Sequence, residues 1–308
     1  MSEAPERRRF RWAPTPSGPL HLGNLFSMIL AWLDCRVSGG ELLLRIDDLD
    51  STRARPEFVR EIFELVTRVG LDWDLGPRTF EEFESSHSQK LAQDFYLAAF
   101  ERAQARTPEL FFACACSRRD LPADSVYPGT CRKRGLPLAR DGSVAWRVRS
   151  DLLSDGARAL GDVVLFRKER LFAYQWVSLQ EDLRWQVTDI HRGEDLLPSS
   201  ALQRGIASAL ASRGLVEYSG FAEVRFVHHP LILSGEKKLS KSEGAQAARA
   251  WVDDPPKLFG AFLKWMGWGG GAARVRDSRE LLALYRERTT AGITPSFSSH
   301  LQLSALTD

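Results

Sequence analysis

The sequence lacks the features of several large protein classes. Its 308 residues include four cysteines, too few for a disulfide scaffold. Residues 1–10 are charged and no apolar stretch follows them directly, so we expect no secretory signal. There is no internal repeat and no low-complexity tract. Hydrophobic residues make up 44% and charged residues 27%, close to the averages of a soluble globular protein, which argues against a disordered, collagen-like or coiled-coil chain. With 42 basic and 40 acidic residues, the overall charge indicates no particular partner.

One uncharged segment is long enough to cross a membrane. Residues 12–33 contain no Asp, Glu, Lys or Arg, and a span needs about 20 apolar residues. Pro14, Pro16 and Pro19 prevent an unbroken helix in the first half, and the apolar remainder, residues 25–33, is too short. We therefore expect a soluble, cytoplasmic protein with reduced thiols and no membrane partner.

The N-terminal part of the chain alternates between the patterns of strands and helices. Residues 8–13 and 41–46 predict strands, the second with a nearly continuous apolar run. Residues 21–37 and 56–69 predict helices, the first ending at a Gly-Gly pair. This alternation predicts an α/β fold with a parallel sheet.

The same pattern returns after residue 174. A strand is predicted over residues 183–187, a helix over 199–210 and a further apolar run over 224–233. The tail from residue 250 to the end has a helical pattern with a glycine break at 269–271.

The segment between these two parts, residues 114–173, has a different composition. It is interrupted by prolines and glycines, carries three of the four cysteines, and has twelve basic against seven acidic residues. A basic, cysteine-bearing insert favours a nucleic-acid interface. A solvated, loop-rich domain explains the charge equally well.

Phosphate binding would need an unusual loop in this chain, because neither the P-loop nor the dinucleotide-binding glycine motif is present. The predicted first strand ends in a Pro/Gly loop, and a helix begins at once. The N-terminus of that helix suits an anion, and His21 can donate to a phosphate there. Gly23 allows a flat ring to approach the backbone closely. On its own, a histidine at a helix start is equally an ordinary polar cap.

A cationic segment lies far along the chain from this loop. Lys237, Lys238 and Lys241 alternate with serines between two glycines. Such a loop can close on a triphosphate and stabilise the charge that develops on pyrophosphate. Taken alone, a short lysine-rich loop is also typical of a solvated surface.

As a pair, HLGN at 21–24 and KLSKS at 238–242 resemble the two signature loops of class I aminoacyl-tRNA synthetases. Further blocks are similar, in the same order, to the glutamyl-tRNA synthetase catalytic domain, from Arg9 to Ala245. These blocks are RWAPTPSGPLHLGN, LLLRIDDLD, GLDWDLGP, FAYQWVSLQEDL, VTDIHRGEDLL and HPLILSGEKKLSKSEGA.

The chain is more similar to a truncated branch of that family, the glutamyl-queuosine tRNA(Asp) synthetases, because only residues 243–308 follow the second signature and a long helical anticodon-binding region is missing. The resemblance implies a Rossmann-like parallel sheet in two parts, residues 1–103 and 174–248. It also implies an inserted zinc-bearing acceptor-type domain over 104–173, and a short helical region over 249–308 without an anticodon-binding domain.

The insert holds a candidate zinc site. Three thiols close together in the sequence suit zinc, and the insert has no histidine, so the fourth ligand is a carboxylate (Asp120 or Asp124), water or a tyrosine. Three unligated buried cysteines are the alternative. The family resemblance selects the Cys-x-Cys…Tyr-x3-Cys pattern and implies one structural Zn²⁺ per chain. Its ligands would be Cys114, Cys116, Tyr127 and Cys131.

The resemblance also assigns the amino-acid site. Arg11 and Arg192 would bind the carboxylates of L-glutamate, since a guanidinium binds a carboxylate bidentately, and Tyr174 would hydrogen-bond nearby. Ala13 and Thr15 would complete the contacts. Without the family, Arg192 is typical of a structural ion-pair residue and Tyr174 of a half-buried sheet residue.

Two positions depart from the family pattern. Asp47 stands where a glutamate usually binds the substrate ammonium, and its reach is shorter by roughly one bond length. Asn24 stands where the fourth residue of the first signature is usually histidine; it can donate to a phosphate but cannot be cationic.

The resemblance implies a two-step reaction. Glutamate, already ionised at neutral pH, attacks the α-phosphate of ATP without a general base and gives glutamyl-adenylate and pyrophosphate. His21, Lys241, the helix N-terminus and Mg²⁺ would stabilise the charge, His21 and Lys241 being the catalytic residues. The ATP contacts would be His21, Gly23, Asn24, Asp195, Lys238 and Lys241.

The acceptor separates the remaining hypotheses. In the truncated branch, the glutamyl group passes to queuosine at the wobble position of tRNA(Asp). The alternatives are a short glutamyl-tRNA synthetase that charges a tRNA 3′ end, an inactive RNA-binding paralogue, and another nucleotidyl transferase such as a cofactor adenylyltransferase. Two intact loops oppose the inactive paralogue, and the RWAPTPSG and HRGEDL blocks oppose the last alternative. No obligate protein partner is inferred.

Overall fold

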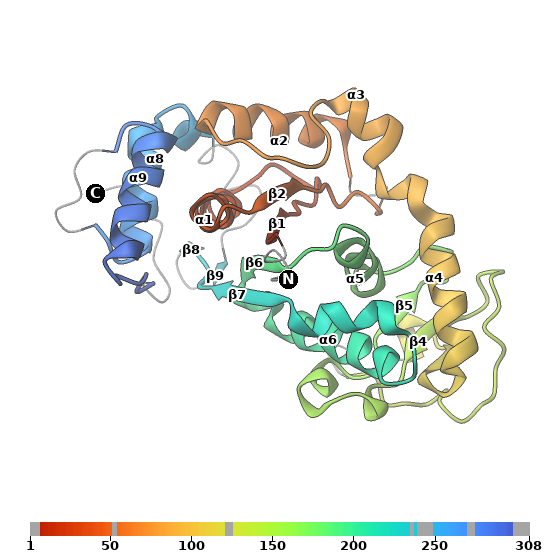
Figure 1. The fold of residues 1–308 in the computed structure, drawn as a ribbon. Coiled ribbons are helices and arrows are strands. Elements are labelled where there is room, and N and C mark those ends of the chain that lie inside the picture. Colours follow the sequence, from red (N-terminus) through yellow and green to blue (C-terminus); the bar gives the residue numbers. More distant parts are fainter. Residues whose placement is uncertain are drawn as a thin grey trace, which may run out of the picture. The chain divides into compact units, whose positions relative to one another are not determined.

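The structure is a computed structural model that divides into two compact units (Figure 1). The first comprises residues 1–89, 189–195 and 225–308, and the second 90–188 and 196–224. The division into four segments expected from the family stays a prediction. The described residues are 7–50, 54–120, 126–234, 237–238, 249–269 and 275–297.

A parallel sheet is the centre of the first unit. Among the described residues it has four strands in the order β2-β1-β6-β7, and each neighbouring pair runs parallel. These strands are β1 (Arg9–Trp12), β2 (Glu41–Leu44), β6 (Asp189–Gly193) and β7 (Arg225–His229). The prediction of an α/β fold with a parallel sheet is therefore confirmed.

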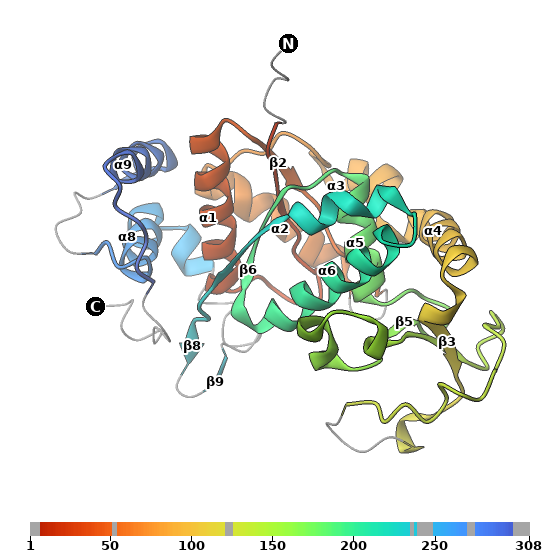
Figure 2. The same cartoon turned by 60° about the horizontal axis from the view of Figure 1, so that its bottom comes forward.

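Helix α1 (Leu22–Ser38) packs on this sheet and ends where Gly39 adopts a left-handed conformation, φ 67°. Figure 2 shows α1 between the strands and the two C-terminal helices, α8 (Pro255–Trp265) and α9 (Ser278–Thr290). Phe26 of α1 meets Phe262 of α8 edge-on, with ring centroids 5.4 Å apart. The apolar side chains of α1, α2 (Pro56–Val69), α8 and α9 thus share one core with the sheet.

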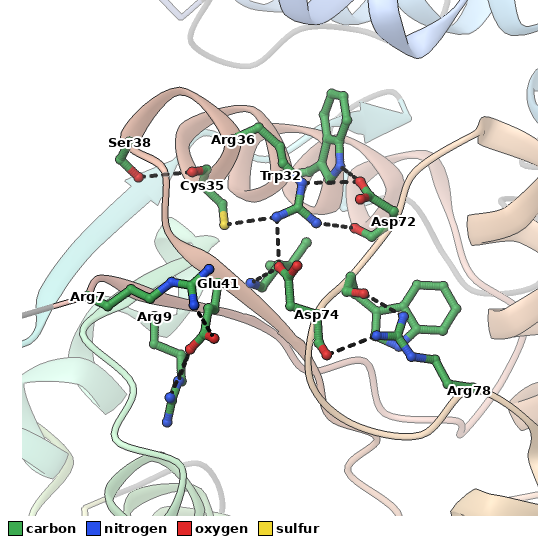
Figure 3. A network of polar contacts seen from close by, with 12 residues as sticks. Arg7, Arg9, Trp32, Cys35, Arg36, Ser38, Glu41, Asp72, Asp74 and Arg78 are labelled. Carbon is green, nitrogen blue, oxygen red and sulfur yellow. Dashed lines mark hydrogen bonds and ion pairs between the residues drawn. The ribbon is translucent and has the colours of Figure 1, made fainter.

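The turn after α2 fixes α1 to β2 through a polar network (Figure 3). The Trp32 indole N–H donates to Asp72 at 2.7 Å, and the Arg36 guanidinium pairs with Asp72 and Asp74. The Asp74 carboxylate also accepts from the Leu42 backbone N–H at 2.8 Å. The block GLDWDLGP, noted above for its family resemblance, therefore has a structural role here.

The second unit contains a separate antiparallel sheet of β3 (Phe111–Cys114), β4 (Ala145–Val148) and β5 (Val164–Phe166). Its helices are α4 (Gln93–Arg106), α5 (Tyr174–Arg184) and α6 (Leu197–Ala211). Phe100, Trp146 and Trp176 pack together in its core, with the Phe100 centroid 4.6 and 5.6 Å from those of the two indoles. The first unit also contains the short helix α3 (Phe80–Glu82) and the β8–β9 pair (Leu233–Ser234 and Lys237–Lys238).

The strand predicted over residues 183–187 is wrong. Helix α5 continues to Arg184, and the strand begins at Asp189. The sequence of β6, Asp-Ile-His-Arg-Gly, hides its strand character because charged side chains are buried there. Asp189 is 2% exposed and its carboxylate pairs with Arg8 and Arg225, which offsets the cost of burying it.

No helix among the described residues has the length and apolar character needed to cross a bilayer.

Asp34 joins α1 to the sheet and to α9. Its carboxylate accepts from the Tyr285 hydroxyl at 2.5 Å, lies 2.8 Å from Nε2 of His191, and pairs with Arg225 at 3.3 Å. Burial acts to raise the pKa of Asp34, but the hydrogen bond and charge of His191, the Tyr285 hydroxyl and Arg225 together lower it to about 2.

We expect Asp34→Asn to lower the free energy of unfolding at pH 7 by about 2 kcal/mol, because one pKa unit corresponds to about 1.4 kcal/mol. The folded pKa lies below that of the unfolded chain, so the contribution is complete above about pH 4 and is lost as the pH falls towards 2. Urea unfolding at pH 7 and at pH 2–3 measures it. Asp253→Asn, at an exposed ion pair with Arg68, is the control and changes little. A loss of equal size at every pH would contradict the assignment.

Candidate functional site

The register of the parallel sheet brings the two predicted carboxylate-binding arginines to one face. Arg11 of β1 lies opposite Ile190 of β6, and Arg192 follows two residues later on the same strand. Alternate residues of a strand point to the same face, so both guanidiniums leave the sheet on one side. His191 points to the other side, where it contacts Asp34. Arg11 and Arg192 are 5% and 4% exposed, so each is a buried cation.

Phe226 on β7 supports Arg192. It lies opposite Ile190 and therefore on the same face, with its ring centroid 4.5 Å from the Arg192 guanidinium carbon. The ring of His228 stacks with that of Phe226 at 6.0 Å. The cation–π contact holds the guanidinium over the ring. Nothing in the sequence signals this contact, since it depends on the pairing of β6 with β7.

The predicted substrate contacts on the first two strands lie at the carboxyl ends of those strands. The Asp47 backbone N–H donates to the Pro14 carbonyl at 3.0 Å, so the segment after β2 runs beside the loop after β1. Ala13 and Thr15 belong to that loop, Ala13 half-buried and Thr15 exposed. Ligand sites in α/β proteins usually form at this end of the sheet.

The side chain of Asp47 is held from two directions. Arg45 donates to it bidentately, Nε at 2.7 Å and Nη2 at 3.0 Å, and the Gln89 amide donates at 2.8 Å. Neighbouring Asp48 accepts from the Ser88 hydroxyl at 2.6 Å and from the Gln89 backbone N–H at 2.8 Å. All five residues are buried. An ammonium group bound at Asp47 would share that carboxylate with Arg45. Ser88 and Gln89 hold the carboxylates of Asp47 and Asp48 in place, and the sequence did not reveal this role.

His21 and Asn24 form a reciprocal cap at the start of α1. Nδ1 of His21 accepts from the Asn24 backbone N–H at 3.3 Å, and the Asn24 side-chain oxygen accepts from the His21 backbone N–H at 3.0 Å. Because Nδ1 is an acceptor, the proton of the neutral ring is on Nε2. The cap thus orients the imidazole at the positive end of the helix, and it explains how asparagine serves at the fourth position of the signature.

Glycines at two positions of the site make room for neighbouring side chains. A Cβ at Gly23 would lie 3.2 Å from Cε1 and Nδ1 of His21, so the flat ring beside Gly23 in this structure is the imidazole itself. At the end of β6, a Cβ on Gly193 would lie 2.5 Å from the Asp195 carboxylate. Asp195 is exposed, and its side chain folds back over the Gly193 backbone.

The described part of the chain does not bring three further predicted residues into this site. Lys241 lies outside the described residues, and Lys238 is described only as part of the β9 backbone. Tyr174 begins helix α5 in the second unit and is half-buried. That His21 lies close to Lys241, and that Tyr174 lies close to Arg11 and Arg192, stay predictions.

The second unit brings the predicted metal ligands together. The sulfurs of Cys114, Cys116 and Cys131 all lie within 4.8 Å of one another, a cluster that could hold a metal ion. The Cys116 and Cys131 sulfurs are 3.6 Å apart, and all three thiols are free. The Tyr127 hydroxyl lies 3.4 Å from the Cys114 sulfur and 3.9 Å from that of Cys116.

The environment of the cluster favours ionisation at one thiol. Burial acts to raise the pKa of Cys131, but the Tyr127 hydroxyl and the backbone at Ala115 lower it to about 6, helped by Cys116 and Arg134. Burial raises the pKa of the Cys116 thiol and of the Tyr127 hydroxyl. A thiolate is the form in which cysteine binds a metal, so these contacts favour the metal-binding form of Cys131.

Comparisons with known proteins identify the family to which this chain belongs. Residues 8–97 match the family model described as tRNA synthetases class I (E and Q), catalytic domain. The glutamyl-Q tRNA(Asp) synthetase of Parasynechococcus marenigrum (strain WH8102) is 37% identical over 92% of this chain and 92% of its own length. The enzyme of the same name from Pseudomonas entomophila (strain L48) is 33% identical over 90% of this chain and 91% of its own.

A solved structure shows the same fold. The glutamate-tRNA synthetase of Elizabethkingia anophelis superposes with a TM-score of 0.71, covering 98% of this chain and 69% of the larger one, at 20% sequence identity.

We expect Gln89→Leu to lower the free energy of unfolding by about 1–3 kcal/mol, because it removes a donor from the buried Asp47 carboxylate. Gln89→Glu has the same shape but adds a carboxylate beside Asp47 and Asp48, so it costs more at pH 7 and recovers as the pH falls towards 4. Urea unfolding at several pH values measures both. Ser86→Ala, which removes an exposed hydroxyl bonded to the Glu82 carbonyl, is the control. A Gln89→Leu protein as stable as this control would contradict the role of Gln89 in stabilising the Asp47 carboxylate.

Proposed function

This chain belongs to the glutamyl-Q tRNA(Asp) synthetases, class I aminoacyl-tRNA synthetase-like ligases, and we propose that it activates L-glutamate with ATP and transfers the glutamyl group to queuosine in tRNA(Asp). One observation carries the glutamate part of this proposal: Arg11 and Arg192 are buried on one face of adjacent parallel strands. Two buried cations on one face suit a ligand with two carboxylates.

The remaining contacts follow from the chemistry of glutamate. Asp47 supplies the negative charge for the ammonium group, and the bonds from Arg45 and Gln89 fix where that charge lies. Phe226 limits the motion of Arg192, so less side-chain entropy is lost on binding. Tyr174 adds a hydrogen bond, and Ala13 and Thr15 line the loop after β1.

ATP binds at the start of α1. Nε2 of His21 donates to the phosphates, next to the positive end of the helix. Gly23 and Asn24 keep the imidazole in that orientation, while Lys238, Lys241 and Asp195 complete the ATP contacts. Mg²⁺ would add positive charge at the phosphates when bound.

The glutamate carboxylate attacks the α-phosphate in line, the bond to the pyrophosphate oxygen breaks, and glutamyl-adenylate forms. The side chains serve by orientation and charge stabilisation, which is the usual source of catalysis in phosphate chemistry. A hydroxyl of the queuosine cyclopentenediol then attacks the acyl carbon and releases AMP. The reaction takes place in the cytoplasm and needs no second protein.

We propose that the cysteine cluster binds one structural Zn²⁺ through Cys114, Cys116, Tyr127 and Cys131. Tetrahedral zinc with bonds of about 2.3 Å to sulfur sets neighbouring sulfurs about 3.8 Å apart and an oxygen ligand about 3.5 Å from each sulfur. The separations of 3.6 Å between sulfurs, and of 3.4 and 3.9 Å from the Tyr127 hydroxyl, fit that geometry. When bound, the ion would link the end of β3 to the loop that carries Tyr127 and Cys131, within the inserted acceptor-type domain.

The function is tested with ATP, labelled glutamate and tRNA from cells with and without queuosine. We expect label only in tRNA(Asp) of the queuosine-containing pool. Arg192→Lys should lower kcat/KM for glutamate by about 100-fold and leave the KM for ATP unchanged, because lysine cannot bind a carboxylate bidentately.

The other outcomes separate the rival functions. Equal labelling of both pools rejects queuosine as the acceptor, and label in tRNA(Glu) supports a 3′-end synthetase instead. Absence of glutamate-dependent pyrophosphate exchange supports an inactive RNA-binding paralogue.

We expect one zinc per chain in the purified protein, and none in the Cys114→Ser, Cys116→Ser double variant. Elemental analysis after dialysis measures the metal. Cys35→Ser changes a buried cysteine of the first unit, outside the cluster, and should retain the zinc. A metal-free preparation that stays folded and active would contradict a structural role for the zinc ion.

A further inference from the structure

The antiparallel sheet of the second unit directs an arginine towards the proposed metal ligands. Arg147 of β4 lies directly opposite Phe112 of β3, so both side chains point to the same face. Cys114 follows Phe112 by two residues and shares that face. The pairing of the two strands therefore presents one thiol and one guanidinium to the same side.

Tyr127 lies against both Arg147 and Phe112. Its ring centroid is 3.9 Å from the Arg147 guanidinium carbon and 6.1 Å from the Phe112 ring centroid. Its hydroxyl, at the far end of the ring, contacts the sulfurs and accepts from the Cys131 backbone N–H at 2.8 Å. The position of the ring thus determines the position of the oxygen within the cluster.

The surroundings of Arg147 hold its guanidinium beside the Tyr127 ring. It is 9% exposed, and Nη1 donates to the Asp162 backbone carbonyl at 2.6 Å. The Asp162 carboxylate binds other groups, the Arg132 guanidinium and the Ser150 hydroxyl. Nε of Arg147 has no hydrogen-bond partner among the described residues. A buried guanidinium whose carbon lies this close to an aromatic ring is stabilised through the face of that ring.

Two further basic residues contact the cluster. Arg134 donates to the Cys131 sulfur at 3.8 Å, and the Lys168 ammonium donates to the Ala115 carbonyl, between Cys114 and Cys116, at 2.7 Å. Three thiolates around Zn²⁺ leave surplus negative charge, and a tyrosine that ionises on binding the ion would add to it. Surplus charge in a buried site is costly unless cations lie close by.

We propose that Arg147 is a positioning residue of the metal centre: it holds the Tyr127 ring so that the hydroxyl meets the three sulfurs, and with Arg134 and Lys168 it balances the charge of the ligand set. This inference rests on the metal site proposed above and goes beyond it, because it gives part of the basic excess of residues 114–173 a function other than RNA binding. Arg134, Arg147 and Lys168 belong to the metal centre.

A double-mutant cycle tests the coupling of Arg147 to Tyr127. The dissociation constant for Zn²⁺ is measured by competition with a chelator in the full-length protein, Arg147→Met, Tyr127→Phe and the double variant. We expect Arg147→Met to weaken zinc binding about tenfold when Tyr127 is present, and less than about twofold in the Tyr127→Phe background. Arg147→Lys, which keeps the charge but not the flat contact, falls between Arg147→Met and the unchanged protein.

Arg140→Met is the matched control, since it removes the same charge from the same insert at an exposed position 3.9 Å from Glu101. It should leave zinc affinity unchanged. Thermal unfolding of the zinc-free proteins shows whether each variant folds. If Arg147→Met does not fold, the zinc affinity of Arg147→Lys in the two Tyr127 backgrounds is compared instead.

The outcomes distinguish a failure of the proposed role of Arg147 from a failure of the proposed zinc ligand set. If the unchanged protein binds no zinc, or Tyr127→Phe binds it equally well, the ligand set itself is wrong. If Tyr127→Phe weakens binding but Arg147→Met does not, or Arg147→Met costs the same in both backgrounds, the ligand set stands and the role of Arg147 is overturned.

Discussion

The alternation of side chains along a buried parallel sheet is the constraint on which the candidate active site depends. One face of the sheet packs on α1 with apolar side chains such as Phe10 and Leu42. The opposite face carries Arg11 and Arg192, and a shift of one residue in the register of β6 would exchange His191 for Arg192. The network at Asp34 therefore helps to position the face that carries Arg11 and Arg192 as well, because it holds the strand on which Arg192 stands.

Helices α1, α2 and α6 and strands β1 and β2 could be predicted from the sequence because their apolar patterns are strong. The strands of the insert and helices α4 and α5 were not predicted. Prediction failed at β6, where buried Asp189, His191 and Arg192 make a central strand look polar. It also missed Gln89 and Phe226. Neither has a local signal, since each matters through a partner reached by folding: Asp47 for Gln89, and Arg192 for Phe226.

The residues at the start of α1 show how far a motif can be interpreted without coordinates. The sequence indicated an anion site at His21, and the structure explains why Gly23 and Asn24 stand beside it. Asn24 completes the cap in both directions, and Gly23 leaves room for the imidazole. A neutral histidine that accepts at Nδ1 is limited to donating at Nε2, so the cap determines the direction of donation as well as the position of the ring.

Net charge is a weaker guide than geometry in the cysteine-bearing insert. Composition counts Arg132, Arg134 and Arg147 alike, yet each has a different partner. Arg132 pairs with the buried Asp162 carboxylate, Arg134 with the Cys131 sulfur, and Arg147 with the Tyr127 ring. A cation that is already paired attracts a phosphate more weakly, because its field is partly cancelled by its partner. The positive charge open to RNA in this segment is therefore smaller than the count of basic residues, and the proposed metal centre would require part of it.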